Sequence, residues 1–168
     1  MKNKRLIALA ICMSLVTVSM AQLKAKVKCP DFYVDVLNGT INDLKPNDTY
    51  NEIRDKFPCS TSTEEESATS KCGGGIFFKD KDIFFFTKRD YVEIGPKFQG
   101  KMSMPLLGAK RNSLFKNLGN PKIKDDLWDA FQTQYGCLVV HYDVAGANGK
   151  IRMIQISTMS TETLQLCE

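Results

Sequence analysis

The sequence feature that most constrains the fold is residues 75–95, "GIFFKDKDIFFFTKRDYVEIG", in which two aromatic stretches flank the polar stretch "KDKD". Short runs rich in phenylalanine and isoleucine on either side of a polar turn are typical of a β-hairpin. Side chains alternate between the two faces of a strand, so Phe84 and Phe86 should point to one side and Phe85 to the other. We therefore expect an antiparallel sheet around this run.

The aromatic side chains of this run exceed what one face of a two-stranded ribbon can hide. If helices cover one face, the other shows an aromatic patch, and exposed patches of this kind mark interaction sites. The alternative is a strand buried on both faces between two layers. On the first interpretation, the candidate binding residues are Phe85 and Tyr91, together with Trp128, Tyr135 and Tyr142 of the second half.

A first short strand and a helix precede the hairpin. Alternation in residues 30–39 places Phe32 and Val34 on one strand face. In residues 41–58, "INDLKPNDTYNEIRDKFP", Asp48 or Thr49 is suited to the N-cap of a helix, Glu52 falls near the capping-box position, and a proline ends the pattern.

A second short helix is expected in the stretch "LFKNLGNP", residues 114–121. Asn112 or Ser113 is its predicted N-cap, and its apolar residues recur at helical spacing. Gly119 fits the position just after the helix, and Pro121 follows two residues on.

The remainder reads mainly as strands. Residues 127–136, "LWDAFQTQYG", fit either a helix or a strand, and we favour a strand that leads to a turn. Residues 137–144 and 150–158 should form an antiparallel pair around the turn "AGANG", and residues 162–168 should add a last short edge.

Both halves thus have the same order of capped helix, proline stop, polar link and antiparallel strands. The predicted fold is α+β, with short helices packed on an antiparallel sheet. After residues 1–21, the predicted modules are residues 22–103 and 104–168, either as separate units or within one compact domain. Two interpretations stay open: a tandem repeat of a helix-then-meander module, or an ordinary α+β succession.

A family resemblance adds to this picture. Residues 106–121, "LLGAKRNSLFKNLGNP", then the strand with Trp128, then "GCLVVHYD" and "GKIRMIQIS", resemble β-lactamase-inhibitor-protein-like domains and the small outer-membrane assembly lipoprotein BamE. The resemblance covers residues 104–158. It implies an α+β fold in which a helical pair covers one face of an antiparallel sheet, and a binding role rather than catalysis.

Residues 1–21 have the pattern of a signal peptide. A basic start, "MKNKR", precedes an apolar run, and Ser19 and Ala21 supply small side chains for cleavage before Gln22. A membrane span needs roughly 20 apolar residues, more than this run provides. Cys12 leaves a lipoprotein as an alternative. The prediction is an exported protein, periplasmic or secreted, without stable membrane insertion after cleavage.

The leader also explains the basic charge of the chain. The formal net charge of +4 comes from 23 basic and 19 acidic residues, and Lys2, Lys4 and Arg5 leave with the leader. The mature chain is then nearly neutral and has no basic stripe, so nothing in its charge favours a nucleic-acid partner.

Export makes disulfides possible, and five cysteines follow the predicted cleavage site. Because five is odd, at least one has no partner within the chain. Cys59 and Cys72 flank a polar loop with little core of its own, and we predict that they are paired. A bond between Cys29 and Cys167 would tie the two termini and leave Cys137 as a buried thiol, but the pairing beyond Cys59–Cys72 stays open.

The sequence offers little for catalysis. His141 is the single histidine, with Cys137 and Asp143 on the same strand face. At about 3.3 Å per residue, Cys137 would lie roughly 13 Å away, too far for a nucleophile and its base. The cysteines and the histidine have no metal-ligand spacing, so we predict neither a metal nor a cofactor. We predict a non-catalytic module that binds a protein or cell-envelope component; the alternatives are an envelope hydrolase using His141 and a structural envelope subunit.

Overall fold

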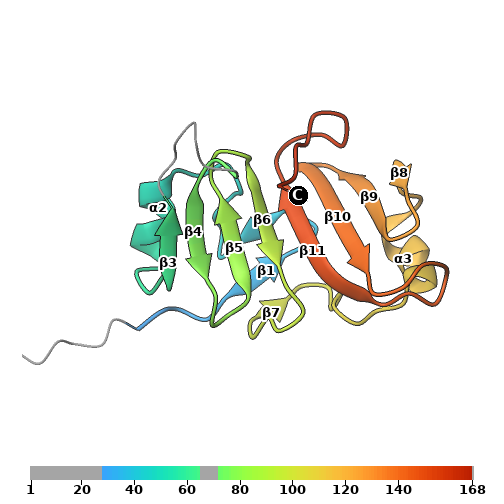
Figure 1. Ribbon diagram of the computed structural model, residues 1–168, viewed down its shortest axis with the longest axis horizontal. Coiled ribbons are helices and arrows are strands. Elements are labelled where there is room, and N and C mark those ends of the chain that lie inside the picture. Colours follow the sequence, from blue (N-terminus) through green and yellow to red (C-terminus); the bar gives the residue numbers. More distant parts are fainter. Residues whose placement is uncertain (1–27, 65–71, 168) are drawn as a thin grey trace, which may run out of the picture.

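Two sheets and two short helices make up the described part of the chain (Figure 1). The computed structural model describes residues 28–64 and 72–167, so the predicted signal peptide lies outside the described residues. In chain order the elements are β1 (Tyr33–Asp35), β2 (Thr40–Ile41), α2 (Tyr50–Lys56), β3 (Ser62–Glu64), β4 (Gly75–Phe78), β5 (Ile83–Phe86), β6 (Tyr91–Ile94), β7 (Lys101–Met102), α3 (Arg111–Leu118), β8 (Ile123–Lys124), β9 (Trp128–Thr133), β10 (Gly136–Tyr142) and β11 (Ile151–Ser157).

The large sheet has eight strands in the order β3-β4-β5-β6-β11-β10-β9-β8, and every neighbouring pair is antiparallel. The expected hairpin is β4 and β5, and β6 extends it into a meander. The expected pair in the second half is β10 and β11. β9, which pairs with β10, lies within "LWDAFQTQYG", so the prediction of a strand there is confirmed. The first strand, β1, pairs instead with β2 and β7 in a separate small sheet.

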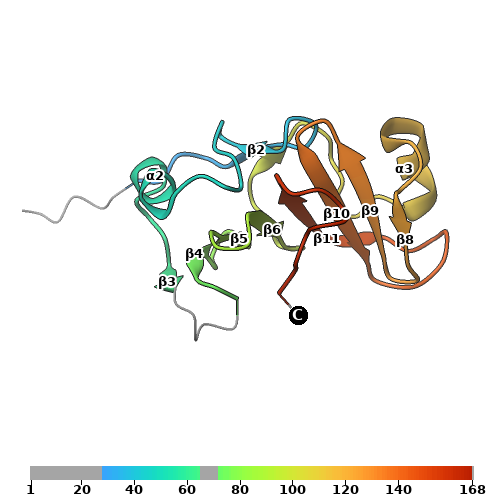
Figure 2. The same cartoon turned by 90° about the horizontal axis from the view of Figure 1, so that it is seen from above.

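The helices and the small sheet lie on one side of the large sheet (Figure 2). This arrangement agrees with the predicted α+β class, although strands dominate it. No helix of the described ranges is long and apolar enough to cross a membrane.

Three of the four helix ends follow local sequence signals. Thr49 is the N-cap of α2, and the predicted capping box with Glu52 is present: the Thr49 hydroxyl accepts from the Glu52 N–H, and the Glu52 carboxylate accepts from the Thr49 N–H. Phe57 is the C-cap of this helix, directly before Pro58, which was predicted to end it. Gly119 ends α3 at a φ of 73°, where glycine is favoured, and its N–H donates to the Phe115 carbonyl.

The start of α3 differs from the prediction. The helix begins at Arg111, before both predicted caps, and no side chain caps it. The N–H groups of Arg111 and Asn112 donate instead to the carbonyls of Gly149 and Ala147 in the β10–β11 loop. Ser113 does not cap the helix either, since it lies within its first turn. A loop distant in sequence therefore satisfies the first N–H groups, a contact that no local pattern reveals.

One core joins the two halves. Its buried side chains come from α2, α3, the small sheet and the inner face of the large sheet. Phe57 of the α2 end packs among Phe32, Phe78 and Phe85, with ring centroids 4.4, 5.7 and 6.2 Å away. The core as a whole contains residues of both predicted modules, so neither module buries its inner sheet face alone.

The disulfides correct the predicted pairing. The structure joins Cys29 to Cys59 and Cys72 to Cys167, so the predicted Cys59–Cys72 bond is wrong and the possible Cys29–Cys167 bond does not form. Cys59 follows α2 and packs, like Cys29, against the main core. Cys72 precedes β4, where the segment after β11 arrives. Among the described cysteines, Cys137 is unpaired and buried.

The segment after β11 also differs from the prediction. Residues 158–167 contain no strand, so the expected last edge at residues 162–168 does not form within the described residues. β3 and β8 are the outer strands of the large sheet. The segment crosses a sheet face instead of extending the sheet.

Candidate functional site: the open face of the large sheet

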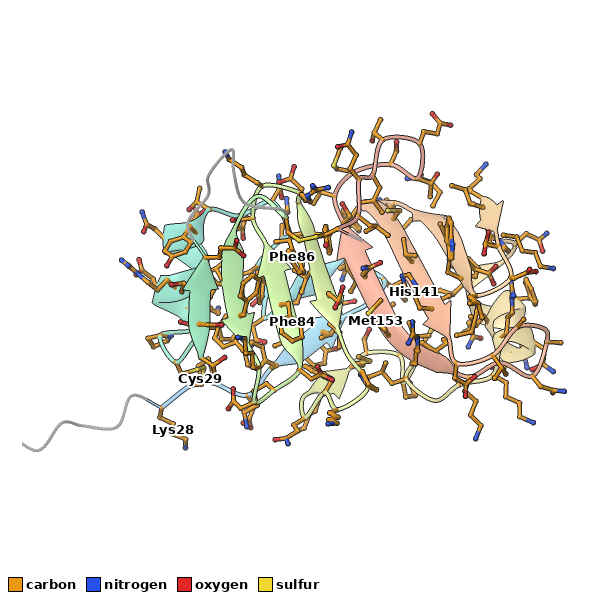
Figure 3. All side chains as sticks on the ribbon, in the orientation of Figure 1. Lys28, Cys29, Phe84, Phe86, His141 and Met153 are labelled. Atoms are coloured by element: carbon orange, nitrogen blue, oxygen red, sulfur yellow. A yellow bond between two sulfur atoms is a disulfide. The ribbon has the colours of Figure 1, made fainter. Side chains whose placement is uncertain are left out.

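The large sheet has one face turned away from the helices, which we call the open face (Figure 2). Strand register places on it the side chains of Phe77, Phe84, Phe86, Glu93, Trp128, His141, Met153 and Gln155. Figure 3 shows Phe84, Phe86, His141 and Met153 on this side of the strands. Except for Gln155, which is buried, these side chains are half-buried, so they are partly accessible to a partner.

An aromatic cluster occupies the β4–β6 half of the open face. The Phe77 ring lies 6.0 Å from the Phe84 ring and 5.5 Å from the Phe86 ring, centroid to centroid. Phe86 stacks on Tyr91 at 4.6 Å. These separations are typical of favourable aromatic pairs. The cluster is therefore held in one arrangement by its own contacts.

A chain of hydrogen bonds crosses the centre of the open face. The Gln155 amide donates to Glu93 at 3.0 Å, and its oxygen lies 2.8 Å from His141 Nε2. Because an amide oxygen accepts, His141 donates from Nε2, which places a proton on that nitrogen. Gln155 is satisfied on both sides, so the chain orients His141 and Glu93 from β10 and β6.

Two of the predicted binding residues lie on the inner face. Phe85 is completely buried in the core, and Tyr142 is 1% exposed. The Tyr142 hydroxyl donates to Asp129, and burial together with this carboxylate raises the pKa of Tyr142. A partner cannot contact either ring on the folded protein. The prediction that Phe85 and Tyr142 bind a partner is wrong, because alternation does not say which face the helices cover.

Tyr91 lies on the open face but is covered. Its ring stacks on Phe86, its hydroxyl accepts from the Cys167 N–H at 3.2 Å, and none of it is exposed. This burial raises the pKa of Tyr91 to about 12. Tyr91 is thus a support for the aromatic cluster rather than a contact residue, which corrects its predicted role.

The other two predicted residues keep their candidate status. Trp128 is half-buried on the open face, beside His141 in the register of β9 and β10. Tyr135 is 47% exposed in the turn between these strands. The sequence prediction missed Phe84 and Phe86 as contact residues, although strand alternation had set them opposite Phe85.

Within the described residues, the contacts of His141 and Cys137 do not support the hydrolase interpretation. His141 bonds to an amide oxygen, and burial raises the pKa of the Cys137 thiol to about 11. An activated cysteine needs a lowered pKa or an adjacent base. Across residues 28–64 and 72–167, no group of three or more His, Cys, Asp or Glu side chains could hold a metal ion.

A separate hollow lies at the start of the described chain. It measures about 710 Å³, and its lining includes Lys28, Asp31, Asp80 and Lys81. Two lysines and two aspartates give this lining no preference for a ligand of either charge. The open face is the better candidate for a functional surface.

Comparison with known proteins does not extend this picture: no family model, no curated protein and no solved structure matches the chain.

Proposed function

We propose that this chain is an exported, non-catalytic binding protein that holds a protein or cell-envelope component on the open face of its large sheet. The observation that carries the proposal is the cluster of Phe77, Phe84 and Phe86 on the face without helices. An antiparallel sheet with one covered face ordinarily presents polar side chains on the other. Aromatic side chains there are typical of the centre of an interface.

The hydrogen-bonded chain supplies the polar part of such a surface. Glu93 and His141 are half-buried and held through Gln155, so they can meet a partner without losing much side-chain freedom. Apolar rings beside fixed polar groups are the usual composition of a specific protein contact. Trp128 and Met153 extend this surface over β9 and β11.

We further propose that the two halves are diverged copies of one helix-then-meander module. The strand order supports this. In the chain, β3 to β6 follow α2, and β8 to β11 follow α3. In the sheet, the two sets of strands lie in mirrored order and meet at the β6–β11 pair. The test is an experimental structure in which residues 45–95 are superposed on residues 106–158. A different helix position relative to the strands would overturn the repeat.

Export is the second part of the proposal. It is supported by the leader-like residues 1–21 and by two disulfides, which form in oxidising compartments. Determination of the N-terminus of the exported protein tests it directly. The expected first residue is Gln22; a chain that retains Met1 and stays in the cytoplasm would overturn this part.

The binding test uses residues 22–168 immobilised and exposed to extracts of the cell envelope and of the secreted fraction. The variant Phe84→Ser with Phe86→Ser removes the accessible rings. The control, Lys79→Ala with Lys81→Ala, changes exposed or half-buried lysines in the turn of the same hairpin.

The expected result is one component retained by the wild type and the lysine control and lost by the phenylalanine variant. Purified again, that component should bind the wild type at a fixed ratio. Equal retention by all three proteins would show that the open face is not the binding surface. A thermal melt of each variant verifies that it is folded.

A further inference from the structure

Residues 158–167 lie against the open face without joining the sheet. Figure 2 shows the chain after β11 on the side of the sheet away from α2 and α3. The segment has no strand assignment, and a turn at Ser160, whose carbonyl accepts from the Leu164 N–H, redirects it. Leu164 and Leu166 are half-buried, while Gln165 between them is exposed. One side of the segment therefore faces the sheet.

The two leucines complete a second apolar cluster. They pack against Ala130, Cys137 and Val139, all of which are nearly completely buried. Ala130 and Val139 are register partners on β9 and β10, on the face opposite the main core. Removing the segment would uncover an apolar site at one end of the open face.

Polar contacts hold the segment at both ends. The Thr161 N–H donates to the Gln132 side chain at 3.2 Å. Arg89 donates to the carbonyls of Gln165 and Leu166, each at 3.3 Å. The Cys72–Cys167 disulfide then fixes the end of the described segment beside β4.

Apart from the disulfide, few contacts hold the segment in place. The segment makes no ladder with the sheet, so two half-buried leucines and a few exposed or part-buried hydrogen bonds oppose the conformational entropy of the ordered residues 158–167. Contacts of this kind sit at the low end of local stability. A covalent link at Cys167 removes most of the freedom that the segment would otherwise regain.

The two disulfides differ in their surroundings. Cys29 and Cys59 pack against the main core, whereas Cys72 and Cys167 belong to neither cluster of buried hydrophobic side chains. Thiol–disulfide exchange requires access of a thiolate to a sulfur atom. All four cysteines are half-buried, and Cys29 and Cys59 also line a hollow at the start of the described chain, so a reductant can reach either bond.

We propose that residues 158–167 form a redox-latched strap: reduction of Cys72–Cys167 by a dithiol releases the strap and uncovers the apolar site of Ala130, Cys137 and Val139 on the open face. One thiolate of the dithiol attacks a sulfur of the bond and forms a mixed disulfide. The second thiol displaces it, so the reductant leaves as a disulfide and the chain gains two thiols.

The consequence for binding rests on the proposed function. The strap covers part of the surface that we assign to the partner, so the reduced protein offers a larger apolar area than the oxidised one. The strap itself can be tested without any partner, because Cys137 lies beneath it and is 1% exposed. A failure of the strap and a failure of the binding proposal are thus distinguishable.

The experiment measures the rate at which iodoacetamide labels Cys137 in the folded protein, read by mass spectrometry of the Cys137 peptide. In the variant Cys72→Ser with Cys167→Ser, release of the strap should raise this rate on the order of tenfold or more. The matched control, Cys29→Ser with Cys59→Ser, removes the other disulfide and should label Cys137 at the wild-type rate.

Two further measurements keep the proposal falsifiable if a serine variant loses its fold. Leu164→Ser with Leu166→Ser retains both disulfides and should also speed labelling of Cys137. In the wild type, labelling of Cys137 should speed up at the dithiothreitol concentration that opens Cys72–Cys167. Labelling of Cys137 at the wild-type rate in the Cys72/Cys167 variant or in the leucine variant would overturn the proposal. So would equal labelling in the two disulfide variants, or unchanged labelling of the wild type once dithiothreitol has opened Cys72–Cys167.

Discussion

Arg111 of α3 and Asp129 of β9 form a buried ion pair that ties the second helix to the sheet. Two guanidinium nitrogens of Arg111 bond to the two carboxylate oxygens of Asp129, at 3.0 and 2.5 Å, and the side chains are 5% and 1% exposed. Tyr142 donates to the same carboxylate, and its ring lies 4.7 Å from the guanidinium carbon. Two further Arg111 N–H groups donate to the carbonyls of Asp125 and Asp126. A buried pair with this many partners is costly to break from one side.

The first prediction concerns this pair. Asp129→Asn should lower the free energy of unfolding by about 3–5 kcal/mol, because it leaves the Arg111 charge buried without a counter-charge. Arg111→Met with Asp129→Leu should cost less than the sum of the two single changes. Urea unfolding measures both. Asp126→Asn is the control, since this exposed side chain should alter stability by no more than about 0.5 kcal/mol. An equally mild effect of Asp129→Asn would contradict a structural role for the pair.

The second prediction separates the two faces of β5. Phe85→Ala should lower the free energy of unfolding by about 3–5 kcal/mol, because it opens a cavity in the core. Phe84→Ala should cost clearly less, because the Phe84 ring is half-buried on the open face. Urea unfolding of the two single variants gives the comparison. Equal losses would mean that both faces of the strand are covered.

The third prediction is a loss of stability at alkaline pH. The ordinary pKa of a tyrosine is about 10, and burial raises that of Tyr91 to about 12 in the folded protein. The folded state thus favours the neutral ring, so this contribution to stability is complete below pH 10 and is lost between about pH 10 and 12. Thermal melts over this interval should fall less steeply for Tyr91→Phe than for the wild type. Parallel curves would contradict the assignment.

The fourth prediction concerns the capping box of α2. Thr49→Ala should lower the free energy of unfolding by about 1 kcal/mol at neutral pH. Hydrogen bonds from the Thr49 side chain and backbone lower the pKa of Glu52 below its ordinary value of 4.5. The charged carboxylate is therefore favoured by folding, so its contribution is present above pH 4.5 and is lost as the pH falls further. The effect of Thr49→Ala should accordingly be smaller at pH 3 than at pH 7, as measured by urea unfolding.

Local patterns were sufficient for many elements of this fold. The capping box of Thr49 and Glu52, the helix end at Gly119, and the strands around "KDKD" each depend on residues within one helical turn or one strand. Strand alternation likewise separated Phe84 from Phe85 without any tertiary information. These features need only the intrinsic geometry of helices and strands.

What the sequence determined by itself is thus the elements, their order and the two faces of each strand. Only the tertiary structure decided which face the helices cover, and hence that Phe85 belongs to the core and Phe84 to the open face. It also decided the cysteine pairs, because Cys29–Cys59 and Cys72–Cys167 join residues 30 and 95 positions apart. Such choices depend on how distant segments pack together, and no periodicity within one segment carries that information.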